Sequence, residues 1–217
     1  MALLRGSRER ALKIVRELRK LFPGARIVLV YSNNWELLVS VILSAQCTDK
    51  KVNEVTLQLF KKYRTLEDYL KAPPREFEKD IRSTGFYRNK AKNILGAARM
   101  IKERFHGKVP RTMEEMLELP GVARKTANVV LGNAYGLVEG IAVDTHVMRL
   151  ARKLGLSEHK DPVKIERDLM KLVPKKDWFF LTYGLIEYGR HVCPARRHEC
   201  SDHPLTKIYP NAANKWP

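Results

Sequence analysis

Residues 119–127 of the chain read LPGVARKTA, the most informative segment of the sequence. Its Pro-Gly pair predicts a turn, and the apolar residues that follow at helical spacing predict an amphipathic helix. Thr112, with Glu115 three residues later, has the pattern of a capping box and predicts a short helix before the turn. Residues 112–136 are therefore predicted to form a helix-hairpin-helix.

The turn of this hairpin is a predicted anion site. The first N–H groups of a helix have no partner within the helix, and the helix dipole makes that end positive. Such a turn can hold a DNA phosphate without reading the base sequence. The candidate DNA-binding residues of the hairpin are Gly121, Ala123, Arg124 and Thr126. An ordinary helical hairpin with a glycine turn is the structural alternative.

Two side chains in this half of the chain are candidates for catalysis. Lys125 falls in the first turn of the second hairpin helix, where an amine can act as a nucleophile. Asp144, in the sequence VDTH, offers a carboxylate for proton transfer. Each also has a structural explanation, because Lys125 can contact a phosphate and Asp144 can cap the helix that follows it. The two roles of Asp144 do not exclude each other.

The charge of the chain agrees with a nucleic-acid partner. The 217 residues include 41 Lys and Arg against 24 Asp and Glu, a formal net charge of +17. Such an excess is typical of proteins that bind phosphate backbones. Ribosomal, membrane-surface and heparin-binding proteins share it, so the charge favours a partner without naming a reaction.

The chain also carries signals of its compartment. Its first twenty residues are charged and lack the apolar core of a signal peptide, and no apolar run approaches the ~20 residues that a membrane-spanning helix needs. Three cysteines, an odd number, do not describe a secreted disulfide scaffold. We expect a prokaryotic-type intracellular protein in the cytoplasm, associated with the nucleoid and without a membrane partner.

Helical periodicity dominates the rest of the sequence. The short β-branched run at residues 27–30 is too isolated to make a sheet, and helix starts are predicted at Asn34 and at the pair Asp161 and Pro162. We predict an all-α fold of two helical lobes with a DNA-binding cleft between them. Residues 27–137 are the predicted six-helix barrel-like domain with the hairpin. Residues 1–26 plus 138–217 are the predicted second helical domain.

Four ordered segments carry a resemblance to a known family. The segments LPGVARKTANVV (119–130) and IAVDTHVMRLARKLGL (141–156) resemble the endonuclease III branch of the helix-hairpin-helix DNA glycosylase superfamily. Upstream, LSAQCTD (43–49) and GFYRNKA (85–91) resemble two further segments of that family. The similarity covers nearly the whole chain.

The resemblance implies a reaction. Lys125 is expected to attack the sugar C1′ of a damaged nucleotide, displace the base and form a Schiff base. Asp144 is expected to stabilise the sugar cation and assist proton transfers, and β-elimination then nicks the strand. The implied enzyme is a bifunctional glycosylase and AP lyase for oxidised pyrimidines in double-stranded DNA. We expect a monomer, because one lesion needs one cleft.

Two other functions remain open. A mismatch uracil or thymine glycosylase is one, although that sister branch typically has tyrosine at the position of Lys125. A non-catalytic DNA-binding hairpin module is the other, although the chain retains both Lys125 and Asp144.

The resemblance also assigns residues to base extrusion, which leaves a gap in the duplex. Gln46 is expected beside the orphaned base, and Phe86 is expected to wedge against the opposite strand. A polar residue at a helix end and a core aromatic are their structural alternatives, and His146 is a pocket or capping residue. The expected phosphate contacts, which could also form a solvated basic face, are Arg88, Lys90, Lys92 and Arg124. The loop with Arg196 and Arg197 is also expected to contact DNA.

The chain departs from the family in its C-terminal loop. Most members bind a 4Fe-4S cluster through four cysteines, whereas this chain has Cys193 and Cys200 followed by His203 and Tyr209. We therefore predict no iron–sulfur cluster and no bound metal. The alternatives are packed free thiols, a Cys193–Cys200 disulfide, and a zinc site. The zinc ligands would be Cys193, Cys200, His203 and either His198 or His191.

A second departure is Ala123, where the family usually has another glycine. If this position needs a positive φ, alanine costs about 1 kcal/mol or more.

Overall fold

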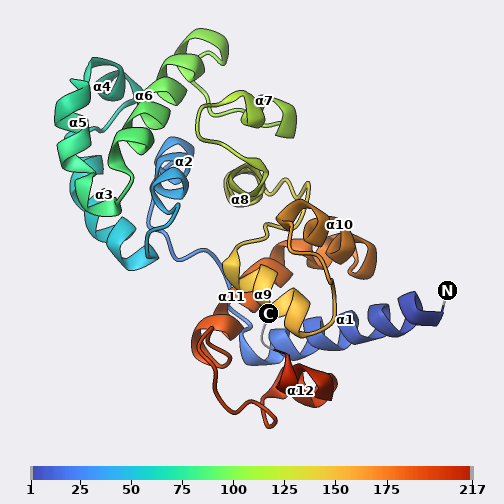
Figure 1. Ribbon diagram of the computed structural model, residues 1–217. Helices are drawn as coiled ribbons and strands as arrows, with labels where there is room; N and C mark the ends of the chain where they lie inside the picture. The colour runs from blue at the N-terminus through green and yellow to red at the C-terminus, as the bar shows by residue number, and fades with distance from the viewer. Residues whose placement is uncertain (1, 216–217) are drawn as a thin grey trace. The chain divides into compact units, whose positions relative to one another are not determined.

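The computed structural model describes residues 2–215, and within that range its regular structure is helical, which confirms the predicted all-α class (Figure 1). The only regular elements in this range are twelve α-helices and three short 3₁₀ helices. The α-helices are α1 (Ala2–Leu21), α2 (Asn34–Leu43), α3 (Asp49–Lys62), α4 (Leu66–Lys71), α5 (Pro74–Asp80), α6 (Tyr87–Arg104), α7 (Met113–Glu118), α8 (Arg124–Tyr135), α9 (Thr145–Lys153), α10 (Pro162–Leu172), α11 (Trp178–His191) and α12 (Pro204–Ile208). The 3₁₀ helices are η1 (Arg82–Thr84), η2 (Lys175–Asp177) and η3 (Pro210–Asn214).

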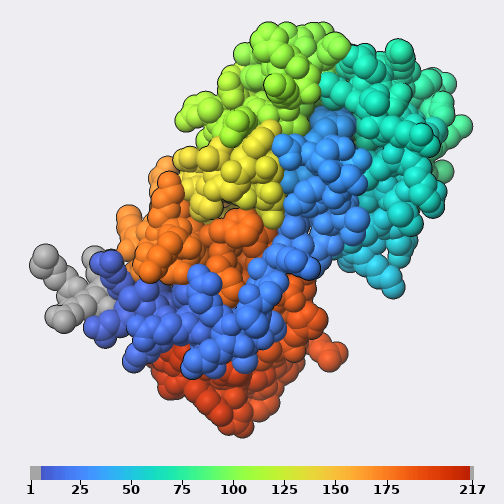
Figure 2. Space-filling view, turned by 180° about the vertical axis from the view of Figure 1, so that it is seen from behind, coloured from blue at the N-terminus to red at the C-terminus, as the bar shows by residue number. Residues whose placement is uncertain are grey.

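The chain forms two compact units. The central unit is Val28–Glu139, and the terminal unit combines Met1–Ile27 with Gly140–Pro217. In the terminal unit, α1 lies beside the C-terminal segments, as Figure 2 shows where blue meets orange and red. The expected domains with borders at 26/27 and 137/138 stay a prediction. Met1, Trp216 and Pro217 lie outside the described residues.

The core of the terminal unit follows from the apolar stripe of α1. Ala11, Ile14, Val15 and Leu18 are each at most 4% exposed. They pack with the buried faces of α9, α10 and α11 in one cluster. α11 approaches α1 closely at Gly184, where an added Cβ would lie 3.3 Å from the Leu18 Cβ. Burial of a continuous apolar stripe holds this unit together.

The core of the central unit is built around α2. Every residue of this helix from Glu36 to Leu43 is buried, because α3, α6 and α8 all pack against it. A second cluster is aromatic, with ring centroids 5.0 to 5.7 Å apart. Its members are Trp35, Tyr63, Tyr69 and Phe77.

The β-branched run at residues 27–30 forms no strand in the described structure. Two of its backbone groups are instead satisfied by one side chain: Asn53 donates from Nδ2 to the Val28 carbonyl at 2.9 Å and accepts from the Val30 N–H at 3.0 Å. An asparagine amide can thus replace a neighbouring strand as hydrogen-bond partner.

Two of the predicted helix starts are confirmed and one moves. Asp161 caps α10 by accepting from the Lys164 N–H at 2.9 Å, with Pro162 as first helical residue. Thr112 caps α7 by accepting from the Glu115 N–H at 3.2 Å. The cap of α2 is Asn33 rather than Asn34, because the Asn33 side chain accepts from the Glu36 N–H at 2.9 Å. Among the described helices, none combines the length and the apolar character that crossing a bilayer requires.

Candidate functional site

The hairpin joins α7 to α8 through a tight turn that requires glycine. Gly121 has φ 78°, in the left-handed region that favours glycine, and an added Cβ would lie 2.8 Å from the Asn93 Cβ. On the same side, an added Cβ at Gly96 of α6 would lie 3.3 Å from the Pro120 Cγ. These two glycines let the turn dock closely on α6, which fixes its position within the central unit.

Ala123 is the N-cap of α8, and its backbone is extended, with φ −97° and ψ 171°. The left-handed penalty considered for this position therefore does not apply. Alanine has no side-chain acceptor to cap the helix, so the first N–H groups of α8 are not satisfied by their own cap residue. This geometry suits the predicted phosphate site.

Lys125 is the second residue of α8 and is half-buried. Ala127, Val130 and Leu131 on the buried stripe of that helix are each 0% exposed and turn to the core. Lys125 is therefore held on a rigid helix whose other face is anchored, while its own side chain is partly accessible. A nucleophile needs this combination of fixed position and access.

Asp144 lies in the terminal unit and caps α9. Its Oδ1 accepts from the Val147 N–H at 2.8 Å, so the structural role considered for this residue is confirmed. The preceding segment is buried, and Thr182 of α11 donates to the Ala142 carbonyl at 3.3 Å. The cap uses one carboxylate oxygen and leaves the catalytic role compatible with it.

His146 follows in the first turn of α9 and packs against α11. An added Cβ at Gly189 would lie 2.5 Å from the His146 Nδ1, so this crossing admits only glycine. His146 is half-buried in this contact. Its assignment to DNA binding stays a prediction.

Gln46 and Phe86 occupy two loops of the central unit and share an unusual backbone. Their φ angles are 51° and 47°, in the left-handed region that non-glycine residues rarely adopt. Phe86 is 66% exposed, so it is not the core aromatic of the structural alternative. Gln46 is exposed as well. Strained backbone and an exposed aromatic ring are both typical of positions kept for function.

The assignment of Lys90 as a phosphate contact is wrong. Lys90 is 4% exposed, and its Nζ donates to the carbonyls of Leu43 and Thr84, each at 2.8 Å. Burial lowers the pKa of this ammonium group. Lys90 instead links the end of α2, just before Gln46, to the segment just before Phe86. The sequence carries a signal of this burial, because Lys90 lies four and seven residues before Ile94 and Ala97, which puts it on the buried face of α6.

The remaining basic candidates differ in exposure. Arg88 is exposed in the first turn of α6, and Arg124 is half-buried at the start of α8. Thr126 is half-buried in the same turn. Arg196 and Arg197 are exposed in the loop after α11. The structure thus places the hairpin, Gln46, Phe86 and Arg88 in the central unit, and Asp144, His146 and the Arg196–Arg197 pair in the terminal unit.

The donor set of the C-terminal loop does not fit a four-cysteine iron–sulfur cluster. Such a cluster usually takes four thiolates, whereas the loop supplies Cys193 and Cys200, both buried free thiols. At the fourth family position, the ring of Tyr209 packs under the Arg10 guanidinium, 4.1 Å from ring centroid to Cζ. The third position is His203.

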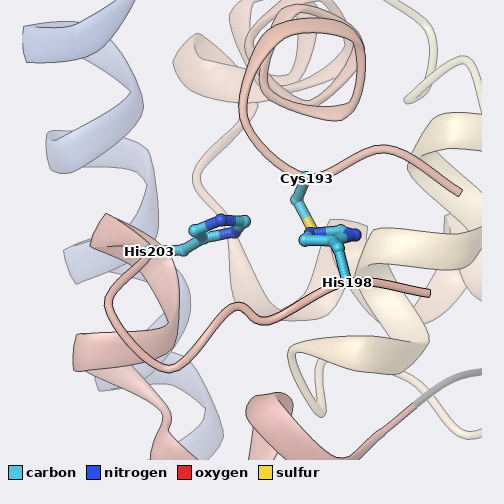
Figure 3. Close-up of side chains that lie close together, drawn as sticks. All are labelled: Cys193, His198 and His203. Atoms are coloured by element: carbon cyan, nitrogen blue, oxygen red, sulfur yellow. The ribbon is translucent and has the colours of Figure 1, made fainter. Parts of the chain in front are cut away.

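A different group of potential ligands gathers in this loop. Cys193, His198 and His203 each bring one ligand atom within 4.8 Å of the others (Figure 3). This group could hold a metal ion. His191 is not part of it, because that exposed side chain lies 3.2 Å from the Glu187 carboxylate. Burial, followed by the neighbouring His198, lowers the pKa of His203 and favours its neutral imidazole.

A large apolar groove of about 820 Å³ lies elsewhere in the central unit. Val28, Val30 and Leu57 line it and are 43 to 65% exposed. None of the predicted site residues lines this groove. Size alone therefore does not locate the chemistry of this protein.

The helical architecture and the hairpin define a class of DNA repair protein. The family described as HhH-GPD superfamily base excision DNA repair protein matches residues 39–175. The chain is 52% identical to the endonuclease III of Synechocystis sp. (strain ATCC 27184 / PCC 6803 / Kazusa) over 205 residues, which covers 94% of each chain. It is 51% identical to that of Bacillus subtilis (strain 168), over 87% of this chain and 86% of the relative.

A solved structure adds to these similarities. An endonuclease III trapped as a covalent intermediate with DNA superposes with a TM-score of 0.90 at 44% identity, covering 95% of this chain and 97% of that one. The chain therefore belongs to the endonuclease III family.

Proposed function

We propose that this protein, a bifunctional DNA glycosylase and AP lyase, removes oxidised pyrimidines from double-stranded DNA and uses Lys125 as its nucleophile. The observation that carries the proposal is the position of Lys125. It lies in the first turn of α8, directly after the turn that can hold a phosphate, and its side chain is half-buried. The covalent DNA intermediate of a 44% identical relative supports an enzyme of the same kind.

The chemistry follows from an amine nucleophile. The Lys125 Nζ bonds to C1′ of the damaged nucleotide, the bond from C1′ to the base breaks, and the base leaves with a proton. The C1′–O4′ bond then breaks as the amine nitrogen gives up its proton and O4′ takes up a proton, so the sugar ring opens and an iminium forms at C1′. Loss of a proton from C2′ then expels the 3′ phosphate, which cleaves the strand. A carboxylate that only activates water would stop at the abasic site.

Asp144 has the supporting role in this proposal. Its carboxylate stabilises positive charge on the sugar as the base leaves and assists the proton transfers. The cap that Asp144 forms with Val147 holds the carboxylate in one orientation. Fixed orientation is what makes such a group effective.

Gln46 and Phe86 are the proposed residues that occupy the duplex once the nucleotide has left the stack. Extrusion costs a few kcal/mol, and a side chain that fills the gap offsets part of this cost. The exposure of both side chains and the shared support of their loops by Lys90 favour this role. The hairpin turn, Arg88, Arg124, Arg196 and Arg197 would contact phosphates.

The proposed reaction does not use an iron–sulfur cluster. The two missing thiolates argue that the protein works without the 4Fe-4S group. Because its substrate is chromosomal DNA, we expect the protein at the nucleoid of a prokaryotic cell, acting as a monomer.

A borohydride trapping experiment tests the proposal. The full chain is incubated with duplexes that carry thymine glycol, a U·G mismatch or an abasic site, and borohydride reduces any imine to a stable adduct. We expect an adduct with thymine glycol for the unaltered protein and its loss in Lys125→Ala. Lys171→Ala, which removes an exposed lysine of α10, is the matched control.

Two other outcomes would overturn the proposal. Release of uracil from U·G without an adduct would identify a mismatch glycosylase instead. DNA binding with neither base release nor adduct would leave only a binding module built on the hairpin.

A further inference from the structure

The loop between α11 and α12 brings together three side chains that the repair reaction does not use. Cys193 directly follows the C-cap of α11, His198 lies in the middle of the loop, and His203 is the N-cap of α12. Figure 3 shows these side chains meeting from three separate points of the backbone. One ligand atom from each lies within 4.8 Å of the other two. We propose that Cys193, His198 and His203 bind a single divalent cation of the zinc class.

The positions of the ligands are fixed by contacts outside the group. The Cys193 N–H donates to the Tyr188 carbonyl at 2.9 Å, and the Arg149 guanidinium donates to the Cys193 carbonyl at 2.5 Å. The sulfur itself is buried in a residue that is 1% exposed. Cys193 is therefore held mainly by its backbone, while its sulfur accepts one longer contact, from the Arg149 Nη1 at 3.8 Å.

The two imidazoles are also arranged as ligands. Nδ1 of His198 lies 2.7 Å from the Arg196 carbonyl, a contact that fixes the ring and directs the lone pair of Nε2 away from that carbonyl. Nδ1 of His203 is buried, and it has no hydrogen-bond partner among residues 2–215. A buried ring nitrogen without a partner is costly unless something binds it. The two rings stack with centroids 5.1 Å apart.

The donor chemistry selects the class of cation. A thiolate and two imidazoles suit zinc and its softer neighbours, whereas magnesium and calcium prefer oxygen ligands. Zn–N bonds of about 2.1 Å and Zn–S bonds of about 2.3 Å separate ligand atoms by roughly 3.5 Å in a tetrahedral site. The observed spacing therefore has to shorten by no more than about 1.5 Å, which side-chain rotation can supply.

The fourth ligand in this proposal is water. Cys200 lies in the same loop, but its sulfur faces the Ala213 carbonyl at 3.8 Å and does not join the group. A bound ion would connect the end of α11 to the start of α12. It would thus replace, with one ion, a connection that cysteine ligands make elsewhere in the family.

Cobalt binding tests this site by its spectrum. The reduced full chain is freed of metal with a chelator and titrated with Co²⁺, then with Zn²⁺ as competitor. We expect one Co²⁺ per chain, a thiolate-to-cobalt charge-transfer band, and displacement by Zn²⁺. Cys193→Ser should abolish the band, and His203→Gln should weaken binding at least tenfold.

Matched controls keep the test specific. Cys47→Ser and Cys200→Ser remove the other two thiols and should leave the charge-transfer band in place. Circular dichroism of each variant, recorded without metal, confirms that the fold is retained. Zn²⁺ should also raise the melting temperature of the unaltered protein and leave that of Cys193→Ser unchanged.

Three results would overturn the assignment. One is the absence of stoichiometric binding, including the case in which mass spectrometry finds a Cys193–Cys200 disulfide instead. Another is a band that survives Cys193→Ser or disappears in Cys200→Ser. The third is an iron–sulfur chromophore with several iron atoms per chain.

Discussion

The central unit and the terminal unit hold their functional residues by opposite means. In the central unit, Gln46 and Phe86 sit in left-handed backbone on exposed loops. In the terminal unit, Asp144 has extended backbone and stabilises α9 as its cap. A left-handed non-glycine residue costs about 1 kcal/mol or more, whereas a good cap contributes about 1 kcal/mol. The residues proposed to enter DNA therefore oppose stability, and the proposed catalytic carboxylate supports it.

The support of the strained loops explains how they persist. The buried ammonium group of Lys90 donates to one backbone carbonyl at the start of each loop. A single side chain therefore fixes two segments that are far apart in sequence. The terminal unit needs no such link at Asp144, because the helix that the residue caps is itself packed against α11. Strain in the central unit is thus paired with a specific buried anchor.

The largest effect on base removal is expected from a substitution that removes the charge of Asp144 but keeps its capping of α9. Asp144→Asn keeps a side-chain oxygen for the Val147 N–H but removes the negative charge. Base removal should slow by about 10²–10⁴-fold, which is typical for loss of an acid–base group, with stability nearly unchanged. Single-turnover kinetics on a thymine glycol duplex and urea denaturation measure the two quantities. An unchanged rate, or a marked fall in stability, would refute the separation of roles.

The second prediction concerns the anchor of the strained loops. Lys90→Met removes the donor for the Leu43 and Thr84 carbonyls and should destabilise the fold by about 3 kcal/mol, since buried acceptors lose a charged donor. Base removal should fall as well, because the loops with Gln46 and Phe86 lose their common support. Urea denaturation gives the free energy of unfolding. Lys61→Met, at an exposed position of α3, should leave it unchanged.

The hairpin turn supplies the third test. Gly121→Ala places a methyl group in left-handed backbone and against Asn93, which should weaken stability by about 2 kcal/mol and reduce DNA affinity. Ala123→Gly is the matched variant two residues away. Because Ala123 is already extended, its change should cost only a few tenths of a kcal/mol. Equal effects of the two substitutions on melting temperature and DNA binding would contradict this account of the turn.

The smallest predicted effect comes from a substitution of Phe86 that should raise stability and lower the rate of base removal. Phe86→Gly removes an exposed ring and suits left-handed backbone, so the free energy of unfolding should rise by about 1 kcal/mol. Base removal should nevertheless fall, because the proposed wedge is gone. Thermal unfolding and single-turnover kinetics on the same preparation decide the matter. A variant that is both less stable and fully active would show that the ring serves the fold.

Several site features were predictable because they depend on near neighbours in the chain. The caps at Thr112 and Asp144 need only the residues three positions later. The position of Lys125 in the first turn of α8 follows from the Pro-Gly turn and the apolar stripe after it. Features that depend only on residues within about one helical turn can be predicted from the local sequence.

Other features depend on partners far along the chain, and local patterns cannot supply them. The burial of Lys90 rests on a carbonyl 47 residues away at Leu43. The choice of His198 rather than His191 as companion of Cys193 rests on how the loop turns back after α11. The strain at Gln46 and Phe86 likewise depends on the packing around their loops.

Composition, periodicity and short motifs were enough to predict the helical class, the hairpin and the basic charge. The family was predictable as well, because the resemblance rests on four short segments that occur in the same order along the chain. The folded structure was needed to show that Lys90 is a buried anchor, that Ala123 bears no strain, and that Cys193, His198 and His203 converge. The physical reason is that burial and convergence are set by packing between distant segments, whereas helix formation and capping are set within a single turn.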